Sequence, residues 1–159
     1  MRKGELSMAP SPRFQHQEIL GELFAELRNF LAANPIGKVS SAPLDVYLDN
    51  ENVVQPDLLF VCKERLAIIE DYVKGAPDLV VEILPPSTSE RDRGPKRALY
   101  AQHGVKEFWL VSPEAASVHI YRFAERDDRP VEMLTGADAL TSPLLPGFSI
   151  AVESIFART

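Results

Sequence analysis

The most constraining feature of this sequence is one acid inside a continuous apolar run. Glu82 lies in the run from Leu79 to Leu84, where every other residue is Leu, Val or Ile. Burying a carboxylate without compensation is costly, so this side chain must be paired, protonated or bound to a metal ion. A nearly continuous apolar run is typical of a central strand covered on both faces. The sequence therefore predicts a buried strand from Asp78 to Leu84 whose acid needs a partner.

The residues after this strand indicate a strand–helix–strand unit. Pro85-Pro86 ends the strand, and Pro95 is tolerated in the first turn of a helix but not in its middle. The pattern predicts a helix from Gly94 to His103, with Gly104 ending it. Glu107 to Ser112 follows as a strand that is apolar on both faces. Such an order usually forms a parallel crossover within one sheet.

The rest of the chain supplies a leading helix and further strands. Apolar residues recur at helical spacing from Phe14, which predicts an amphipathic helix of about five turns that ends before Asn34-Pro35. Pro43 to Leu48 and Val53 to Val61 are predicted to form an antiparallel hairpin. The other expected elements are a weak helix over Glu64–Tyr72, strands over Ser117–Phe123 and Val131–Leu134, and a closing strand and helical turn within Leu144–Phe156. Together these elements predict an α/β fold with a central mixed sheet flanked by helices.

Length and charge narrow the class of protein. With 159 residues, 45% of them hydrophobic, the chain is expected to form a single domain over residues 1–159. The net charge of −6 excludes a uniformly basic coat, so nucleic acid would have to contact a local basic patch. Cys62 is the only cysteine, which excludes an internal disulfide and a multi-cysteine zinc site. Without an apolar run of roughly 20 residues, the chain is expected to be cytoplasmic and not membrane-bound.

Two Pro-Asp pairs offer a second acid beside Glu82. Asp78 is four strand residues from Glu82, about 13 Å away, which is too far for both to bind one ion directly, so Asp78 is expected to be a turn or capping acid. Asp57 follows Pro56 on a neighbouring strand, about 4.8 Å across the sheet, and could reach Glu82 if the strand register allows. Two carboxylates on adjacent strands would form the oxygen site that Mg²⁺ or Mn²⁺ prefers.

Several short motifs together resemble a known family. A Pro-Asp pair, a strand ending in an acid and then a helical lysine is the pattern of the PD-(D/E)XK nuclease superfamily. Within it, the chain looks like the bacterial family of putative restriction endonucleases, formerly a domain of unknown function. The motifs that carry the resemblance span nearly the whole chain: Gly4-Glu5-Leu6 with Ser11-Pro12 and His16; Gln55-Pro56-Asp57; Gly75 to Glu82; Ser87-Thr88; Asp92, Lys96 and Tyr100; and Gly104 to Trp109.

This resemblance implies a restriction-endonuclease-like fold and a Mg²⁺- or Mn²⁺-dependent endonuclease acting on DNA, with a homodimer suggested by analogy with dimeric nucleases. The implied catalytic residues are Asp57, Glu82 and Lys96. The implied metal ligands are the two acids together with the carbonyl of Ile83. Further polar side chains are expected around them: His16, Asp92 and Tyr100 as accessory groups, and Arg91, Arg93 and Arg97 as phosphate contacts.

One departure from the superfamily pattern keeps alternatives open. The usual lysine lies two residues after the strand acid, where this chain has Leu84. Lys96, on the following helix, is the substitute, and it shares a helix face with Tyr100 and with Asp92 if the helix extends that far. The alternatives are a catalytically decayed nuclease fold that binds nucleic acid or protein, and a hydrolase that uses Asp57 and Glu82 as acid and base. Glu82 could also serve only in an ion pair with Lys96 or an arginine.

Overall fold

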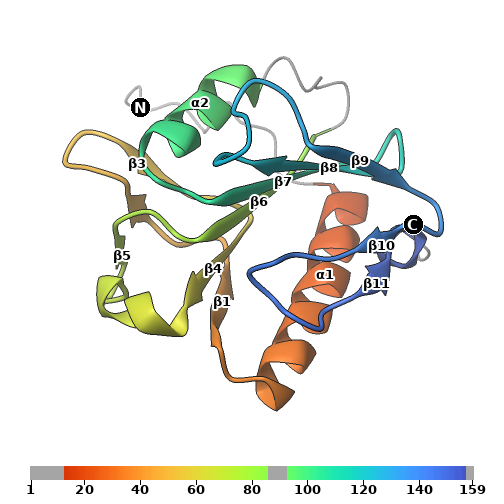
Figure 1. Cartoon of the computed structure of the whole chain (residues 1–159), viewed down its shortest axis with the longest axis horizontal. Helices are drawn as coiled ribbons and strands as arrows, with labels where there is room; N and C mark the ends of the chain where they lie inside the picture. The colour runs from red at the N-terminus through yellow and green to blue at the C-terminus, as the bar shows by residue number, and fades with distance from the viewer. Residues whose placement is uncertain (1–12, 86–92, 157–159) are drawn as a thin grey trace.

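A six-stranded mixed sheet forms the centre of the fold in the computed structural model, which describes residues 13–85 and 93–156 (Figure 1). Neighbouring strands in this sheet are antiparallel except for β6 and β7, which are parallel. Helix α2 lies between these two strands in sequence, so the predicted strand–helix–strand unit is confirmed. In spatial order the strands are β1 (Gly37–Ser41), β4 (Leu58–Cys62), β6 (Leu79–Ile83), β7 (Glu107–Ser112), β8 (Ser117–Arg122) and β9 (Glu132–Thr135).

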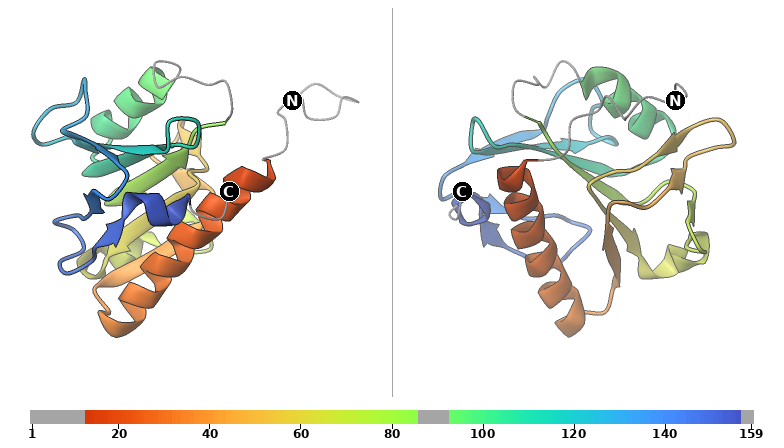
Figure 2. Two further views of the ribbon diagram at one scale, coloured as in Figure 1. Left: turned by 90° about the vertical axis from the view of Figure 1, so that its right-hand side faces the viewer. Right: turned by 180° about the vertical axis from the view of Figure 1, so that it is seen from behind.

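The two α-helices cover opposite faces of this sheet (Figure 2). Helix α1 (Phe14–Ala33) has 20 residues and ends before Asn34-Pro35, as predicted. Its buried residues are spaced four apart and therefore lie on one side of the helix: Ile19, Leu23, Leu27 and Leu31. Helix α2 (Gly94–Gln102) ends one residue earlier than predicted, and Gly104 follows with a φ of +95°, a conformation that favours glycine. The described helices lack the combined length and apolar character that crossing a membrane requires.

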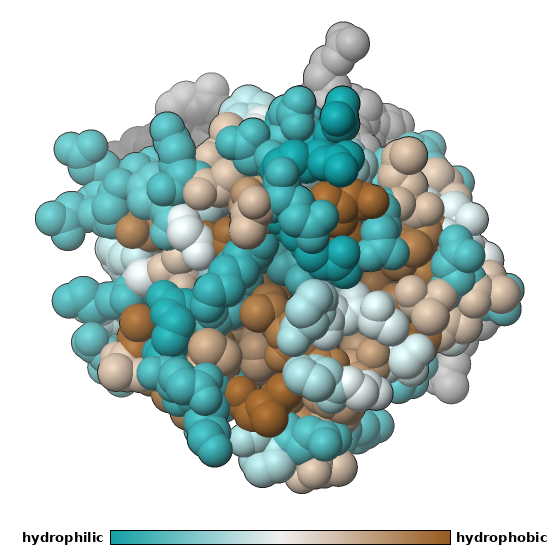
Figure 3. Space-filling model, in the orientation of Figure 1, coloured by the Kyte–Doolittle hydropathy of each residue, from teal (hydrophilic) through white to brown (hydrophobic). Residues whose placement is uncertain are grey.

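Side chains of the central strand alternate between two apolar clusters. Val81 and Ile83 pack in the cluster under α1, whereas Val80 and Leu84 pack in the cluster under α2. Each of these four side chains is buried, which confirms the prediction of a strand covered on both faces. Glu82 shares the α2 face with Val80 and Leu84 because residues two apart on a strand point the same way. Hydrophilic side chains cover much of the outer face seen in Figure 3, with hydrophobic residues in separate patches.

Smaller elements complete the described parts of the chain. A three-stranded sheet has the order β3-β2-β5, and a two-stranded sheet joins β10 to β11. Two short 3₁₀ helices lie outside these sheets. The bounds are β2 (Val46–Tyr47), β3 (Val53–Val54), β5 (Val73–Lys74), β10 (Ala139–Leu140), β11 (Ile150–Ala151), η1 (Lys63–Ile68) and η3 (Val152–Ile155).

The region before β6 differs most from the sequence prediction. β2 and β3 pair antiparallel as predicted, but the expected single strand Val53–Val61 was wrong: it is divided into β3 and β4. Pro56 lies in the break, where it has no N–H to donate to a strand ladder. In the main sheet β4 lies between β6 and β1, and the sequence analysis missed β1 because Gly-Lys-Val-Ser-Ser has a single large apolar residue. The weak helix predicted over residues 64–72 is the short η1 instead.

Candidate active site at one end of strand β6

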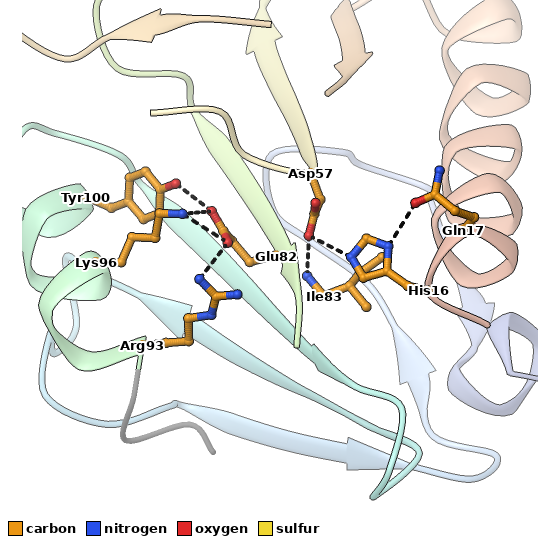
Figure 4. Close-up of polar contacts among 8 residues, drawn as sticks. All are labelled: His16, Gln17, Asp57, Glu82, Ile83, Arg93, Lys96 and Tyr100. Atoms are coloured by element: carbon orange, nitrogen blue, oxygen red, sulfur yellow. Dashed lines mark hydrogen bonds and ion pairs between the residues drawn. The ribbon is translucent and has the colours of Figure 1, made fainter. Parts of the chain in front are cut away.

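Asp57 and Glu82 lie beside each other at the end of the β4–β6 pair. The register pairs Leu58 with Val81, and one further residue along the antiparallel ladder sets Asp57 opposite Glu82. The Asp57 Oδ2 atom accepts a hydrogen bond from the Ile83 N–H at 2.7 Å, which fixes the carboxylate at the end of β6 (Figure 4). The register therefore meets the condition that the sequence left open, and the two acids come together.

Glu82 is compensated by groups from α2 and the residue before it. Its side chain is only 4% exposed. The Tyr100 hydroxyl donates to Glu82 Oε2 at 2.7 Å, and the Lys96 Nζ atom lies 3.3 Å from Oε2 and 3.5 Å from Oε1. The Arg93 guanidinium lies 3.6 Å from Oε1 (Figure 4). The acid inside the apolar run is thus paired, which is one of the three states that its burial allows.

The helical spacing of α2 explains how these partners converge. Lys96 and Tyr100 are four residues apart and therefore share one face of the helix. Tyr100 is fully buried, and burial, followed by the charge of Glu82, raises the pKa of its hydroxyl, so it stays protonated and donates. Arg93 is the N-cap residue of α2, and its Nε is buried without a hydrogen-bond partner among the described residues. A buried donor of this kind suits an additional acceptor such as a phosphate oxygen.

His16 reaches Asp57 from the first turn of α1. Its Nε2 lies 3.5 Å from Asp57 Oδ2, and its Nδ1 lies 3.0 Å from the Gln17 side-chain oxygen (Figure 4). The hydrogen bond with Asp57 outweighs the effect of burial and raises the pKa of the imidazole. Sequence reasoning missed Gln17, because adjacent residues on a helix do not normally face each other.

Not every predicted residue joins this group. Arg97 donates to the Asp127 carbonyl oxygen, and its guanidinium lies 5.6 Å from the centre of the Tyr121 ring, so the structure does not bring it to the two acids. Ile83 contacts Asp57 through its N–H, and the ligand role of its carbonyl stays a prediction. Arg91 and Asp92 lie outside the described residues.

Asp78, at the other end of β6, has its own partners. It is fully buried and accepts hydrogen bonds from the Cys62 N–H at 2.8 Å and the Lys106 ammonium at 2.7 Å. Arg65 lies 3.2 Å away. As expected, Asp78 does not join Glu82, but the expected turn or capping role was wrong, because the buried carboxylate forms ion pairs with Lys106 and Arg65.

The two site acids fit a hard divalent cation by their chemistry. Carboxylate oxygens, completed by water and phosphate oxygens, are the ligands that Mg²⁺ normally uses. Within the described residues, no group of three or more His, Cys, Asp and Glu side chains is arranged to hold a metal ion. A cation here would therefore bind through Asp57 and Glu82 with ligands from backbone, water or substrate, which suits Mg²⁺ or Mn²⁺ better than zinc.

Comparison with known proteins identifies first the fold and then the family. A putative nuclease from Anabaena variabilis has the same fold, with a TM-score of 0.77, 19% identity, and coverage of 98% of this chain and 88% of that one. This match confirms the restriction-endonuclease-like α/β fold. The family model described as "Putative restriction endonuclease" matches residues 1–153, and the chain belongs to this family. The structural match shows the fold, and the family description supports a nuclease-like function.

A further relative comes from Synechocystis sp. and is described as an uncharacterized protein. It is 29% identical over 121 residues, which cover 75% of this chain. The match spans 63% of that relative, so this chain corresponds to less than two thirds of its length.

Proposed function

We propose that the chain is a Mg²⁺- or Mn²⁺-dependent endonuclease that hydrolyses phosphodiester bonds in DNA. The supporting observation is that two acids and a lysine from three separate segments meet at one end of β6. In this proposal Asp57 and Glu82 hold the cation, with the Ile83 carbonyl as a third ligand. When bound, a divalent cation neutralises phosphate oxygens and activates water for attack.

Lys96 takes the role of the strand lysine in this proposal. The position two residues after Glu82 is occupied by Leu84, which is 5% exposed and packs in the apolar cluster under α2. The ammonium of Lys96 instead reaches Glu82 from the helix above, at 3.3 Å. A lysine there would orient the attacking water or stabilise the negative charge that develops on the phosphate.

Two further side chains would support the reaction. The Nε of Arg93, which has no hydrogen-bond partner among the described residues, would donate to a phosphate oxygen of the substrate. His16, held by Gln17, would position Asp57. Arg93 and Lys96 place positive charge beside the two acids, where a polyanionic substrate would bind despite the overall charge of −6.

The test compares the parent protein with Asp57→Asn on supercoiled and linear DNA. The parent should cleave DNA with Mg²⁺ or Mn²⁺ and not with a chelator, and Mn²⁺ should raise its unfolding temperature by binding only the folded state. Asp57→Asn should lose both effects, whereas the matched control Asp128→Asn, an exposed loop acid, should keep them. Equal cleavage and equal Mn²⁺ stabilisation in the parent and Asp57→Asn would contradict the proposed site.

A binding module without catalysis is the second candidate. It is favoured by one observation: Glu82 is already compensated by Lys96, Arg93 and Tyr100, an arrangement that could serve stability alone. This candidate predicts DNA binding that is unaffected by a chelator and no cleavage under any metal condition. The Lys96→Ala variant distinguishes the two, because it would lower cleavage in an enzyme and only weaken binding in a module.

A further inference from the structure

The partners of Glu82 differ in how firmly they hold its carboxylate. The Tyr100 hydroxyl is 2.7 Å from Oε2 and belongs to a fully buried side chain. The Lys96 ammonium is 3.3 Å from one oxygen and 3.5 Å from the other, longer than the roughly 2.7–2.9 Å of a strong charge-assisted bond. The Lys96 side chain is also 31% exposed and has a flexible four-carbon stem. Tyr100 is thus a fixed partner of Glu82, whereas Lys96 can leave.

We propose that Lys96 is an exchangeable counter-ion of Glu82: a divalent cation that binds Glu82 displaces the lysine ammonium and frees it to reach the substrate. The inference rests on the proposed metal site at Asp57 and Glu82. Because the ammonium lies within 3.5 Å of both carboxylate oxygens, it competes with a cation for the same oxygens. Its positive charge would also repel the cation at such short range.

This exchange would make the lysine available only when the cation is bound. Tyr100 would stay on Oε2 and keep the carboxylate oriented, since it carries no charge that opposes the cation. Linkage requires that the effect be mutual: if the cation loosens the Lys96–Glu82 contact, removing Lys96 must tighten the cation by the same factor. A lysine that merely held Glu82 in shape would have the opposite effect, because its removal would weaken cation binding.

Asp78 and Lys106 provide a matched control within the same chain. They form a second contact between a lysine and a buried acid, at 2.7 Å, and Asp78 directly precedes β6, away from the proposed site. The Lys106 side chain is 55% exposed, so it is accessible like Lys96. A cation bound at Glu82 should leave this pair unchanged.

The first measurement is the Mn²⁺ dissociation constant by calorimetry, after treatment with a chelator and dialysis, for the parent, Lys96→Met and Lys106→Met. We expect Lys96→Met to bind Mn²⁺ about tenfold more tightly than the parent, a typical size for coupling between two ligands. Lys106→Met should bind like the parent. If Lys96→Met does not fold, Lys96→Gln replaces the charge with a neutral amide and tests the same point.

The second measurement needs no substitution. An amine-acylating reagent is applied to the parent with and without Mn²⁺, and each modified lysine is quantified by peptide mass spectrometry. Labelling of Lys96 should rise with Mn²⁺, whereas labelling of Lys106 should not change.

Three results would overturn the proposal. Mn²⁺ binding that is unchanged or weaker in a folded Lys96→Met or Lys96→Gln variant would exclude competition. Tighter binding without increased labelling of Lys96 would show repulsion without displacement. A parent that binds no Mn²⁺ would contradict both this inference and the proposed metal site. A parent whose Mn²⁺ binding depends on Asp57 but does not change when Lys96 is replaced would contradict this inference alone.

Discussion

Strand β6 carries a buried acid at each end, and the two differ in what compensates them. The Asp78 carboxylate accepts hydrogen bonds from a backbone N–H and a lysine ammonium at 2.7–2.8 Å, and the Arg65 guanidinium lies 3.2 Å away. Glu82 receives one short bond, from a tyrosine hydroxyl at 2.7 Å, and its two basic partners lie 3.3–3.6 Å away. Both acids are almost inaccessible, so burial alone does not distinguish them.

The two acids differ in whether a metal cation could replace the basic side chains that pair with them. Burial has the largest effect on Asp78 and would raise its pKa, yet hydrogen bonds from the Cys62 N–H and Lys106 outweigh it and the pKa is lowered. That carboxylate is thus held ionised by strong bonds that serve the fold. The looser basic groups around Glu82, next to a second acid, leave oxygen atoms that another cation could take. From this comparison we propose that Asp78 serves stability and Glu82 serves function.

The most direct test of these separate roles is to neutralise each acid in turn and measure DNA cleavage. Glu82→Gln should lower DNA cleavage by about a thousandfold or more, because it removes a proposed metal ligand and weakens stabilisation of the transition state. Asp78→Asn should retain cleavage at temperatures where it is folded. Initial rates on a fluorescent DNA duplex with saturating Mn²⁺ measure both. Comparable losses in the two variants would show that the two ends of β6 do not have separate roles.

When stability is measured, the order of the two variants should reverse, so that Asp78→Asn has the larger effect. Asp78→Asn removes charge-assisted bonds from a fully buried side chain, so the free energy of unfolding should fall by about 2–3 kcal/mol. Glu82→Gln should cost less than this, because the basic partners of Glu82 lie 3.3–3.6 Å away and the glutamine carbonyl can still accept the Tyr100 hydrogen bond. Urea denaturation with a chelator present gives both values. If Glu82→Gln loses more free energy of unfolding than Asp78→Asn, the main role of Glu82 is to stabilise the fold.

Much of the proposed site could be predicted from the sequence, because its acids have distinctive surroundings. Glu82 is the only acid in the apolar run Leu79–Leu84, and Asp57 repeats the Pro-Asp pattern that precedes this run. The lysine followed from helical spacing and the family resemblance. The structure then set Asp57 and Glu82 opposite each other through the β4–β6 register, which no local pattern determines.

Features that depend on distant segments could not be predicted. The basic partners of Asp78 come from η1 and from the segment before β7, and nothing local marks them. Arg93 and Arg97 looked equivalent in sequence, yet one lies beside Glu82 and the other contacts Asp127. Arg93 is an N-cap residue outside the regular helix, so the four-residue spacing does not set its direction. Homodimer formation and a cytoplasmic location stay predictions.

A smaller effect is expected from moving the lysine back to the strand. Lys96→Ala should lower cleavage by about a hundredfold or more, as loss of a group that moves or orients protons does. Adding Leu84→Lys should recover about tenfold of that loss, because residue 84 shares the strand face of Glu82. The rescue should be partial and stronger at higher pH if the neutral amine acts as base, since the apolar surroundings of residue 84 disfavour the charged amine.

The control for this rescue is Leu84→Lys alone, which should be less active than the parent because it crowds two ammonium groups near Glu82. Initial rates between pH 6 and pH 9 for the parent, the two single variants and the double variant form a complete double-mutant cycle. If the double variant folds and binds Mn²⁺ but shows no rescue at any pH, the role proposed for Lys96 is wrong. If the parent is also inactive on every DNA tested, the binding module becomes the better interpretation.

The smallest effect concerns the helix that carries the partners of Glu82. His103, at the end of α2, has Nδ1 2.9 Å from the Leu99 carbonyl oxygen and Nε2 2.7 Å from Asp49 Oδ2. Both ring nitrogens face acceptors, so the protonated imidazole alone makes both bonds. The Leu99 carbonyl, followed by Asp49, raises the pKa of His103 above its usual 6.5. This contact therefore stabilises the fold fully below about pH 6.5 and is lost as the pH rises through the folded-state pKa.

Acid and alkali should thus weaken different contacts, the ion pairs of Asp78 in one case and the hydrogen bonds of His103 in the other. The lowered pKa of Asp78 means that its stabilisation is present above its ordinary pKa of 3.8 and is lost as the pH falls through its folded-state pKa. The stabilisation from His103 should instead be lost as the pH rises, because its imidazole then loses its proton. The expected result is that His103→Gln lowers the unfolding temperature by a few degrees at pH 5.5 and by much less at pH 9, since the contact is largely exposed and screened by solvent. Asp78→Asn should instead lower it equally at both pH values, because Asp78 is ionised throughout that range. A His103→Gln effect that does not change between pH 5.5 and pH 9 would show that the side chain acts by packing and that its charge contributes nothing.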